Sequence, residues 1–402
     1  MINLKKHTII ALGYFLIIAL LGMLMRLFPV VDIPINYRFI VHTHSHIALL
    51  GWIYTGLTTL IYKLYLSGKE IDRKYKFLFW CTQATIVGML LTFPVKGYAL
   101  SSIVFSTLFL LASYGFVWFF IKYTSEEQKK TGSYKFIRTA LWYMVISSIG
   151  PWALGIIMNT FGSTSPWYRN AVYFFLHFQY NGWFIVALFG LLFFMMERHH
   201  IIFPKGTFNR FFWIFNVGVV FTYFLSVLWM QPHPLFYLLA GIGAVAQCIA
   251  FVMLIKGLLP IWNGLKDTLS SNVVLMLKTA SLLFSFKIIL QFFGSIPYIA
   301  TMVSNNMDFI MGYLHWTFLG VVSIALLAFL HHFKLLYLPK KLYLLYLTGF
   351  ILTEGLLFYK GTVVWLGYTL MEDYFTLLAT TSFIFLIAIA GILTAQLTNK
   401  NI

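Results

Sequence analysis

The sequence has few charged residues and almost no cysteine, and each shortage excludes a broad class of protein. Only 10% of its 402 residues are charged and 60% are hydrophobic, whereas soluble globular domains have about 25% charged residues. The two cysteines, Cys81 and Cys248, lie in apolar stretches without a CxxC pattern. This excludes a disulfide framework and a CxxC-type metal or redox site. The chain is therefore neither a soluble domain nor a disulfide-stapled one.

What the sequence has instead is a series of continuous apolar blocks. Each block is about twenty residues long, which is the helix length that crosses a hydrocarbon core of about 30 Å. The blocks do not alternate between polar and apolar residues, so helices are predicted rather than barrel strands. The first block follows Lys5 and Lys6 and is predicted to be a retained helix rather than a cleaved signal peptide. We predict an all-α integral membrane protein whose single membrane domain covers residues 1–402, with twelve spans at roughly 7–30, 37–66, 75–96, 97–122, 135–160, 168–196, 210–230, 234–260, 273–303, 309–335, 342–360 and 370–397.

The positive charges predict the orientation of these spans. Twelve spans place both termini on one side, and 22 of the 28 Lys and Arg residues then lie on that side, while Lys287 falls inside a span. The other side has five, namely Arg26, Arg38, Lys96, Arg169 and Lys360. By the positive-inside rule, both termini are predicted to be cytoplasmic in a bacterial-type inner (plasma) membrane. The net charge of +17 is thus explained by a lipid bilayer as partner, and nucleic acid is not expected.

A motif recurs in the second, sixth and tenth predicted spans. The first copy is Tyr37-Arg38 followed by His46 and Gly51-Trp52. The second copy is Tyr168-Arg169, followed at the same offsets by His177 and Gly182-Trp183. A weaker third copy has only His315 and Gly320. The repeats divide the chain roughly into residues 1–130, 131–268 and 269–402, each with four spans. The three marked spans run in the same direction, so equal offsets within them imply equal depths in the membrane. Eight residues at about 1.5 Å each place His46 and His177 about 12 Å below Arg38 and Arg169. The glycine would let a flat group or another helix approach closely.

Histidines inside membrane spans mark functional sites by default. Neutral imidazole is the commonest protein metal ligand, and paired axial histidines suit a low-spin haem. A site without thiolates and with few carboxylates favours haem, copper or iron over calcium or magnesium. The alternative for any one histidine is a hydrogen-bonded structural role. We predict metal ligation by His46, His177 and His315.

The second span has two further histidines, His42 and His44. At helical spacing His42 and His46 share a face and His44 points roughly opposite, so this helix could serve two cavities. His46 is the preferred ligand because the repeat marks it, and His44 is the second choice. The alternative is that His42 and His44 line a polar path or hydrogen-bond haem propionates.

Other polar residues in or near the spans have two interpretations each. Arg38 and Arg169 lie above the histidine layer, where they could hold haem propionates or contact lipid headgroups. Lys287 and Gln291 share a face of the ninth span, and Glu354 lies within the eleventh. Lys287 and Glu354 are candidates for a proton path, or they are structural or snorkelling groups.

These residues resemble a known family. The three histidine-marked repeats resemble subunit I of the haem–copper oxidase superfamily (cytochrome c oxidase subunit I-like), in a divergent branch. The segment from His44 to Trp52 is also similar to NnrS-type membrane haem proteins. The resemblance implies twelve helices in three pseudo-equivalent four-helix arcs, haem held by His46 and His315, and copper or a second haem at His177. It departs from the oxidases in having no histidine pair in residues 211–230, so a standard copper-B oxygen-reducing centre is not expected.

The resemblance implies a function in electron transfer or in NO or O2 binding, with a redox partner protein or quinol as electron donor. If the chain is an enzyme, an oxidoreductase of the cytochrome oxidase or NO-related class is implied. The alternative is a proton-coupled transporter that uses the intramembrane histidines, Lys287 and Glu354. A membrane zinc hydrolase is less favoured, because no water-activating carboxylate lies near the histidines in the sequence.

Overall fold

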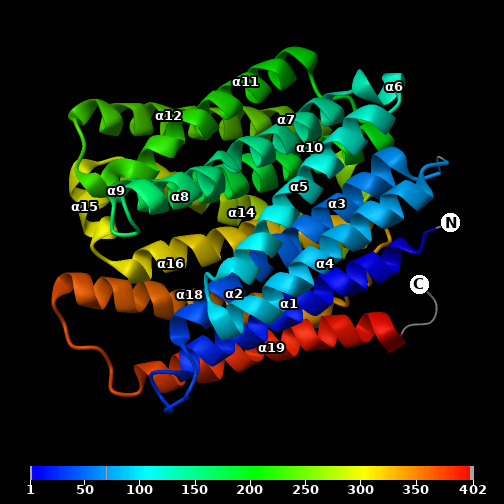
Figure 1. The fold of residues 1–402 in the computed structure, drawn as a ribbon. Coiled ribbons are helices and arrows are strands. Elements are labelled where there is room, and N and C mark those ends of the chain that lie inside the picture. The colour runs from blue at the N-terminus through cyan, green and yellow to red at the C-terminus, as the bar shows by residue number, and fades with distance from the viewer. Residues whose placement is uncertain (1, 69, 399–402) are drawn as a thin grey trace. The chain divides into compact units, whose positions relative to one another are not determined.

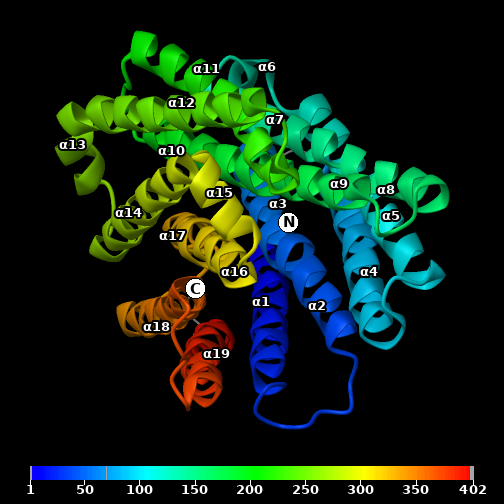
Figure 2. The ribbon, with the colours of Figure 1, turned by 90° about the vertical axis from the view of Figure 1, so that its left-hand side faces the viewer.

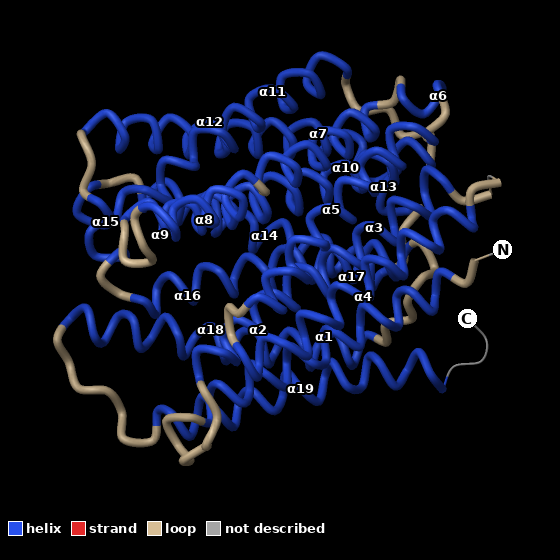
Figure 3. Tube along the Cα trace, in the orientation of Figure 1, coloured by secondary structure: helices blue, strands red, loops and turns tan. Residues whose placement is uncertain are grey.

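The structure is a computed structural model that describes residues 2–68 and 70–398. All regular elements in those residues are helices (Figure 3). Twelve of the described helices are long and apolar enough to cross a membrane, which confirms the predicted number of spans. They are Leu4–Leu27, Tyr37–Leu66, Asp72–Lys96, Leu100–Tyr123, Gly132–Thr160, Pro166–Arg198, Lys205–Met230, Pro234–Asp267, Ser271–Gly294, Met307–His332, Lys340–Leu366 and Tyr374–Thr398.

The chain folds into two compact units. Unit 1 comprises Met1–Ser125, Leu326–Val363 and Gly367–Ile402. Its helices are α1 (Leu4–Leu27), α2 (Tyr37–His46), η1 (Ile47–Tyr54), α3 (Thr55–Ile61), η2 (Tyr62–Leu66), α4 (Asp72–Lys96), α5 (Leu100–Tyr123), most of α17 (Ile324–His332), most of α18 (Lys340–Leu366) and α19 (Tyr374–Thr398). Helices α1 and α19 pack side by side, and α1 begins at the end of unit 1 where α19 finishes (Figure 1).

Unit 2 comprises Glu126–Ala325 and Val364–Leu366. Its helices are α6 (Glu126–Lys129), α7 (Gly132–Ser147), α8 (Ile149–Thr160), α9 (Pro166–His177), η3 (Phe178–Phe184), α10 (Ile185–Arg198), α11 (Lys205–Thr222), η4 (Tyr223–Met230), α12 (Pro234–Leu258), η5 (Leu259–Ile261), α13 (Trp262–Asp267), α14 (Ser271–Gly294), α15 (Pro297–Ser304), α16 (Met307–His315) and η6 (Trp316–Ser323). Helices α11 and α12 lie side by side (Figure 2). The first unit boundary, after Ser125, is close to the predicted repeat boundary, whereas the third predicted repeat is divided between the units.

Two predicted spans are interrupted, and proline lies close to each interruption. The predicted span 135–160 is bent at Ser148, between α7 and α8, three residues before Pro151. A proline inside a helix removes one backbone hydrogen bond and clashes with the preceding turn. The predicted span 273–303 ends as α14 at Gly294, and Pro297 starts the separate helix α15. Proline is favoured at this first helical position because its missing N–H would have no partner there.

The repeated glycines are places where another helix of the same unit approaches the backbone. A Cβ atom added at Gly51 would lie 2.8 Å from Cγ of Tyr14 on α1, and one added at Gly182 would lie 2.7 Å from Cβ of Tyr143 on α7. In both repeats, therefore, the first helix supplies a tyrosine that packs on the glycine of the second. Of the two interpretations of the motif glycine, close helix packing is the one observed at these positions.

This packing predicts opposite effects for two glycine-to-alanine substitutions in unit 2. Gly182→Ala should destabilise the protein by about 1–3 kcal/mol, because overpacking forces the Tyr143 backbone to shift. Gly155→Ala on α8 meets nothing within 4 Å and should stabilise by up to about 1 kcal/mol, since alanine is the better helix former. Thermal unfolding in detergent, followed by tryptophan fluorescence, measures both. Equal effects of the two substitutions would contradict the packing described here.

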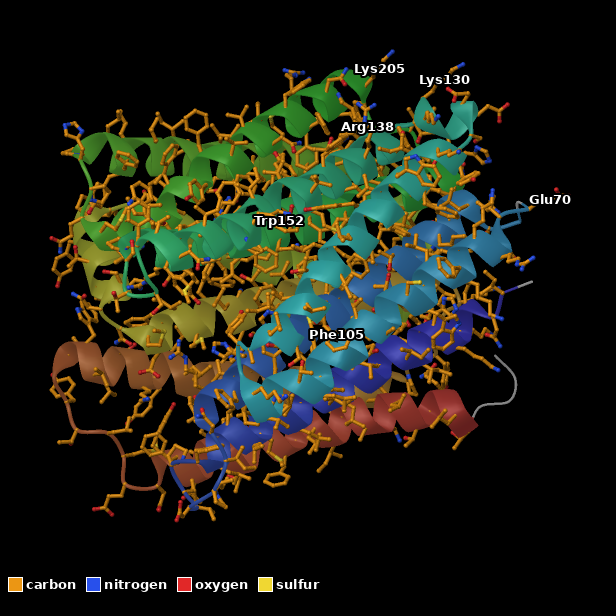
Figure 4. The ribbon with its side chains drawn as sticks, in the orientation of Figure 1. Glu70, Phe105, Lys130, Arg138, Trp152 and Lys205 are labelled. Atoms are coloured by element: carbon orange, nitrogen blue, oxygen red, sulfur yellow. The ribbon has the colours of Figure 1, made fainter. Side chains whose placement is uncertain are left out.

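The basic loops of unit 2 gather at one end. Lys130 and Lys205 project from that end, whereas Trp152 lies along the side of α8 (Figure 4). Lys129 lies 2.7 Å from Glu126 in the same loop region, and this hydrogen bond lowers the pKa of the Glu126 carboxyl. Clustering of lysine at one end of the membrane-spanning helices agrees with the charge asymmetry seen in the sequence.

Candidate functional site

Each histidine of the repeat is the last residue of an α-helix that continues as a π-helix. Helix α2 ends at His46 before η1, α9 ends at His177 before η3, and α16 ends at His315 before η6. π-Helices are rare and often lie at functional sites. The same backbone irregularity thus follows all three histidines, including His315, around which the sequence motif is weakest.

His42 and His46 face the end of α4 and the loop that follows it. The ring centroids of His46 and Phe93 are 4.4 Å apart, and those of His42 and Tyr98 are 4.6 Å apart. His46 Nδ1 lies 2.8 Å from the His42 carbonyl oxygen, to which it donates, while Nε2 is 3.3 Å from the Tyr98 hydroxyl. A ring nitrogen bonded to a backbone carbonyl is typical of metal-ligating histidines. His46 is therefore oriented so that Nε2 can bind a ligand.

His44 faces the opposite side of α2, as its spacing predicts, and lies against α1. A Cβ atom added at Gly22 would be 3.1 Å from His44 Cε1, so the small residue on α1 makes room for this ring. The backbone of Ile18, also on α1, lies beside this ring. The Nδ1 atom of His44 is buried and has no hydrogen-bond partner among residues 2–68 and 70–398. A buried polar atom without a partner costs about 1–3 kcal/mol, so this nitrogen is a candidate ligand atom.

A charged cluster that the sequence did not reveal lies near His44. The guanidinium of Arg26 on α1 is close enough to interact electrostatically with both His44 and Glu354. Arg26 Nη1 donates a 2.7 Å hydrogen bond to Ser382 Oγ on α19. Glu354 on α18 is 1% exposed and Ser382 is 5% exposed, so the cluster lies inside unit 1. The sequence feature that could have indicated this cluster is the small residue Gly22, which lies one helical turn before Arg26.

The two arginines predicted to hold propionates lie in different environments. Arg38 is exposed at the start of α2. The Arg169 guanidinium lies 4.2 Å from the Trp229 ring centroid and donates from Nε to the Tyr173 hydroxyl at 2.9 Å. Arg169 is thus held by side chains of its own unit, and an interaction with a cofactor would have to replace these contacts.

Both ring nitrogens of His177 are occupied in unit 2. Nε2 lies 2.8 Å from the Val219 carbonyl oxygen, and Nδ1 lies 3.1 Å from Asn181 Nδ2. A metal ion at His177 would therefore have to displace one of these hydrogen bonds. As placed, His177 has the contacts of a structural histidine that joins η3 and α11.

His315 lies in unit 2 near a group of tyrosines. The ring of Tyr313, two residues earlier on α16, lies edge-on to that of Tyr180 on η3, with 6.4 Å between the centroids. The next residue after the histidine, Trp316, donates from Nε1 to the Leu283 carbonyl on α14 at 2.9 Å. These contacts hold the α16–η6 junction against η3 and α14, and His315 is half-buried there.

Lys287 and Glu354 lie in different units and have different electrostatic neighbours. Lys287 on α14 is completely buried and its Nζ donates to Gln291 Oε1 at 2.8 Å, as their shared face predicts. The electrostatic neighbour of Lys287 in unit 2 is His177, whereas that of Glu354 in unit 1 is Arg26. A proton path that includes both residues stays a prediction.

No group of three or more His, Cys, Asp or Glu side chains that could hold a metal ion occurs within the described part of the chain. A copper centre built from three protein ligands would need such a group. A haem requires only one or two axial ligands from the protein.

No protein-family model matches the chain, and no curated protein sequence matches it. The functional argument therefore depends on the residues and their geometry.

Proposed function

We propose that the chain is a haem-binding integral membrane protein that works in electron transfer or in binding NO or O2. The observation that supports this most is His44, a half-buried imidazole whose buried Nδ1 atom lacks a partner among the described residues. The Ile18 backbone lies beside the same ring, and a backbone carbonyl is a usual hydrogen-bond partner of a ligating histidine. A bound haem would supply reversible one-electron chemistry or a site for a diatomic gas.

The structure changes the preferred ligand within the second span. The repeat favours His46, but His46 Nε2 already has the Tyr98 hydroxyl at 3.3 Å, whereas His44 Nδ1 has no partner in the described residues. We therefore place His44 first and His46 second. His315 remains the proposed second axial ligand, and copper or a second haem at His177 remains a weaker proposal because both its nitrogens are bonded.

The residues around His44 are suited to a charged cofactor. The Arg26 guanidinium offers a charge-assisted hydrogen bond to a carboxylate or to another polar group at a cofactor edge. Gly22 keeps the α1 backbone close to the His44 ring. We propose that Arg26, rather than Arg169, is the arginine that contacts the cofactor, because Arg169 is engaged by Trp229.

The wider proposal follows the resemblance to oxidase subunit I. The twelve helices would form three pseudo-equivalent four-helix arcs in a bacterial-type inner membrane with cytoplasmic termini. A quinol or a redox partner protein would supply electrons. The alternative of a proton-coupled transporter is supported by the burial of Lys287 and Glu354 in membrane-spanning helices, since such residues line ion pathways.

An absorption spectrum of the purified full-length protein tests the haem proposal. After expression with added haem precursor we expect a Soret band, a haem stoichiometry of at least one per chain, and a spectral change on reduction with dithionite. A protein purified under these conditions without bound haem would contradict the proposal. Proton flux in proteoliposomes prepared from such haem-free protein would then support the transporter alternative.

A further inference from the structure

Lys287 in unit 2 is a buried lysine that has no role in the proposed haem site. The residue is completely buried in α14. Its Nζ has one hydrogen-bond acceptor, Gln291 Oε1 at 2.8 Å. An ammonium has three N–H donors, so two of them have no acceptor among the described residues.

Burial opposes the charged form of this amine, whereas two aromatic rings and one amide oxygen near it favour that form. Its Nζ lies 5.7 Å from the Phe284 ring centroid and 5.8 Å from the Tyr313 ring centroid. Aromatic faces attract a cation at distances up to about 6 Å, and more strongly when water is excluded. The Gln291 carbonyl oxygen adds a dipole with its negative end toward the nitrogen.

No protein carboxylate compensates this charge. Unit 2 has five acidic residues, all of them described, and none of them contacts Lys287. They lie elsewhere: Glu126 pairs with Lys129, Glu197 accepts from Ser133, Glu127 and Asp267 are exposed, and Asp308 is in the first turn of α16. His177 also interacts electrostatically with Lys287 in unit 2, but an imidazole is no counter-ion for an ammonium. A buried cation in a membrane protein is costly without a partner.

We propose that Lys287, Gln291 and Tyr313 form a binding site for a small monovalent inorganic anion, such as chloride or nitrite. The anion would accept hydrogen bonds from the free N–H groups of Lys287 and compensate its charge between α14 and α16. This site belongs to unit 2 and does not depend on haem binding at His44. Compensation of a buried charge by a bound ion follows the same physics as a buried ion pair.

The test is a chloride titration of the thermal stability of the full-length protein in detergent. Sodium gluconate replaces sodium chloride at constant ionic strength, so that screening does not change. An anion that binds only the folded state raises the Tm in a saturable manner, and we expect such a rise for the wild type. Sodium nitrite should give the same type of curve.

Three variants make the result specific to this site. Lys287→Met should lose the chloride-dependent rise, whereas Lys278→Met, an exposed lysine on the same helix, should keep it. Gln291→Glu places a carboxylate where the amide oxygen now lies, 2.8 Å from Nζ. This variant should also lose the chloride response, and its Tm in gluconate should exceed that of the wild type.

Two results would overturn the proposal. One is a wild-type Tm that does not differ between chloride and gluconate, which would mean that Lys287 is stored as a neutral amine. The other is a chloride response that persists in Gln291→Glu, which would place the anion elsewhere. Gln291→Glu decides the question even where Lys287→Met does not fold, because it retains the lysine and adds its partner.

Discussion

Replacement of His44 by alanine is expected to remove the Soret band from the purified protein, whereas replacement of His46 should leave most of it. His44 Nδ1 is buried without a hydrogen-bond partner in the described residues, and its ring lies beside the Ile18 backbone. His46 instead has polar neighbours at both nitrogens, the His42 carbonyl and the Tyr98 hydroxyl. The two histidines are two residues apart on one helix, so each variant controls for general damage to the helix.

A rescue experiment separates ligation from a structural role for His44. The His44→Gly variant leaves space where the imidazole ring was, and free imidazole added during reconstitution with haem should restore the Soret band if His44 is an axial ligand. A structural histidine would give no such recovery. Loss of the Soret band in His46→Ala but not in His44→Ala would contradict this assignment and identify His46 as the haem ligand. His315→Ala, measured in the same way, tests the second proposed haem ligand.

Removal of Arg26 alone is expected to destabilise the protein strongly, and removal of Arg26 together with Glu354 is not. Arg26→Leu removes the guanidinium that interacts electrostatically with the carboxyl of Glu354, which is 1% exposed. Breaking a buried charge pair from one side costs about 3–5 kcal/mol, whereas replacing both partners by apolar groups is often neutral. The single variant should therefore lower the Tm by roughly 4–6 °C.

Thermal unfolding of four proteins completes this cycle: the wild type, Arg26→Leu, Glu354→Leu and the double variant. The exposed Arg38 supplies a control, since Arg38→Leu should change the Tm little. If the double variant loses as much stability as the two single variants added together, Arg26 and Glu354 do not interact, and the cluster has another organisation.

The transmembrane helices could be predicted from the sequence because a membrane imposes one strong requirement. Every backbone polar group in the hydrocarbon core must be hydrogen-bonded within the protein. A continuous apolar run such as Leu100–Tyr123 is therefore expected to form a helix. The predicted ends of the helices were less accurate than their number. The predicted span 273–303 did not include the break after Gly294. Pro297 lies near the end of an apolar stretch that hydropathy alone treats as continuous.

The π-helix Ile47–Tyr54 could not be predicted, because its sequence is apolar on almost every side. Seven of the eight residues in Ile47–Tyr54 are buried. This segment therefore has no polar face, and a shift in the spacing of polar residues, which would indicate the wider turn, cannot be seen in its sequence. The hydrogen bond from His177 to Val219 was also invisible, since the two residues are 42 positions apart. A histidine that is bonded at both nitrogens looks the same in a sequence as one that is free to bind a ligand.

Arg26 was missed for a different reason. The positive-inside argument assigns a charge to one side of the membrane from its position along the chain. It does not indicate whether the side chain points to the headgroups or into the protein. Arg26 is in the last turn of α1 and was therefore counted with the outer charges, but its guanidinium is directed to Ser382 and Glu354 inside unit 1.

The wide turn that follows each repeated histidine also shows which residues it does not require. The third copy lacks the Tyr-Arg pair and the tryptophan. The π-helix Trp316–Ser323 nevertheless begins directly after His315, as η1 and η3 begin after His46 and His177. The Tyr-Arg pair and the tryptophan are therefore not needed for the turn, and the histidine and the glycine five residues after it are the motif residues that all three turns share.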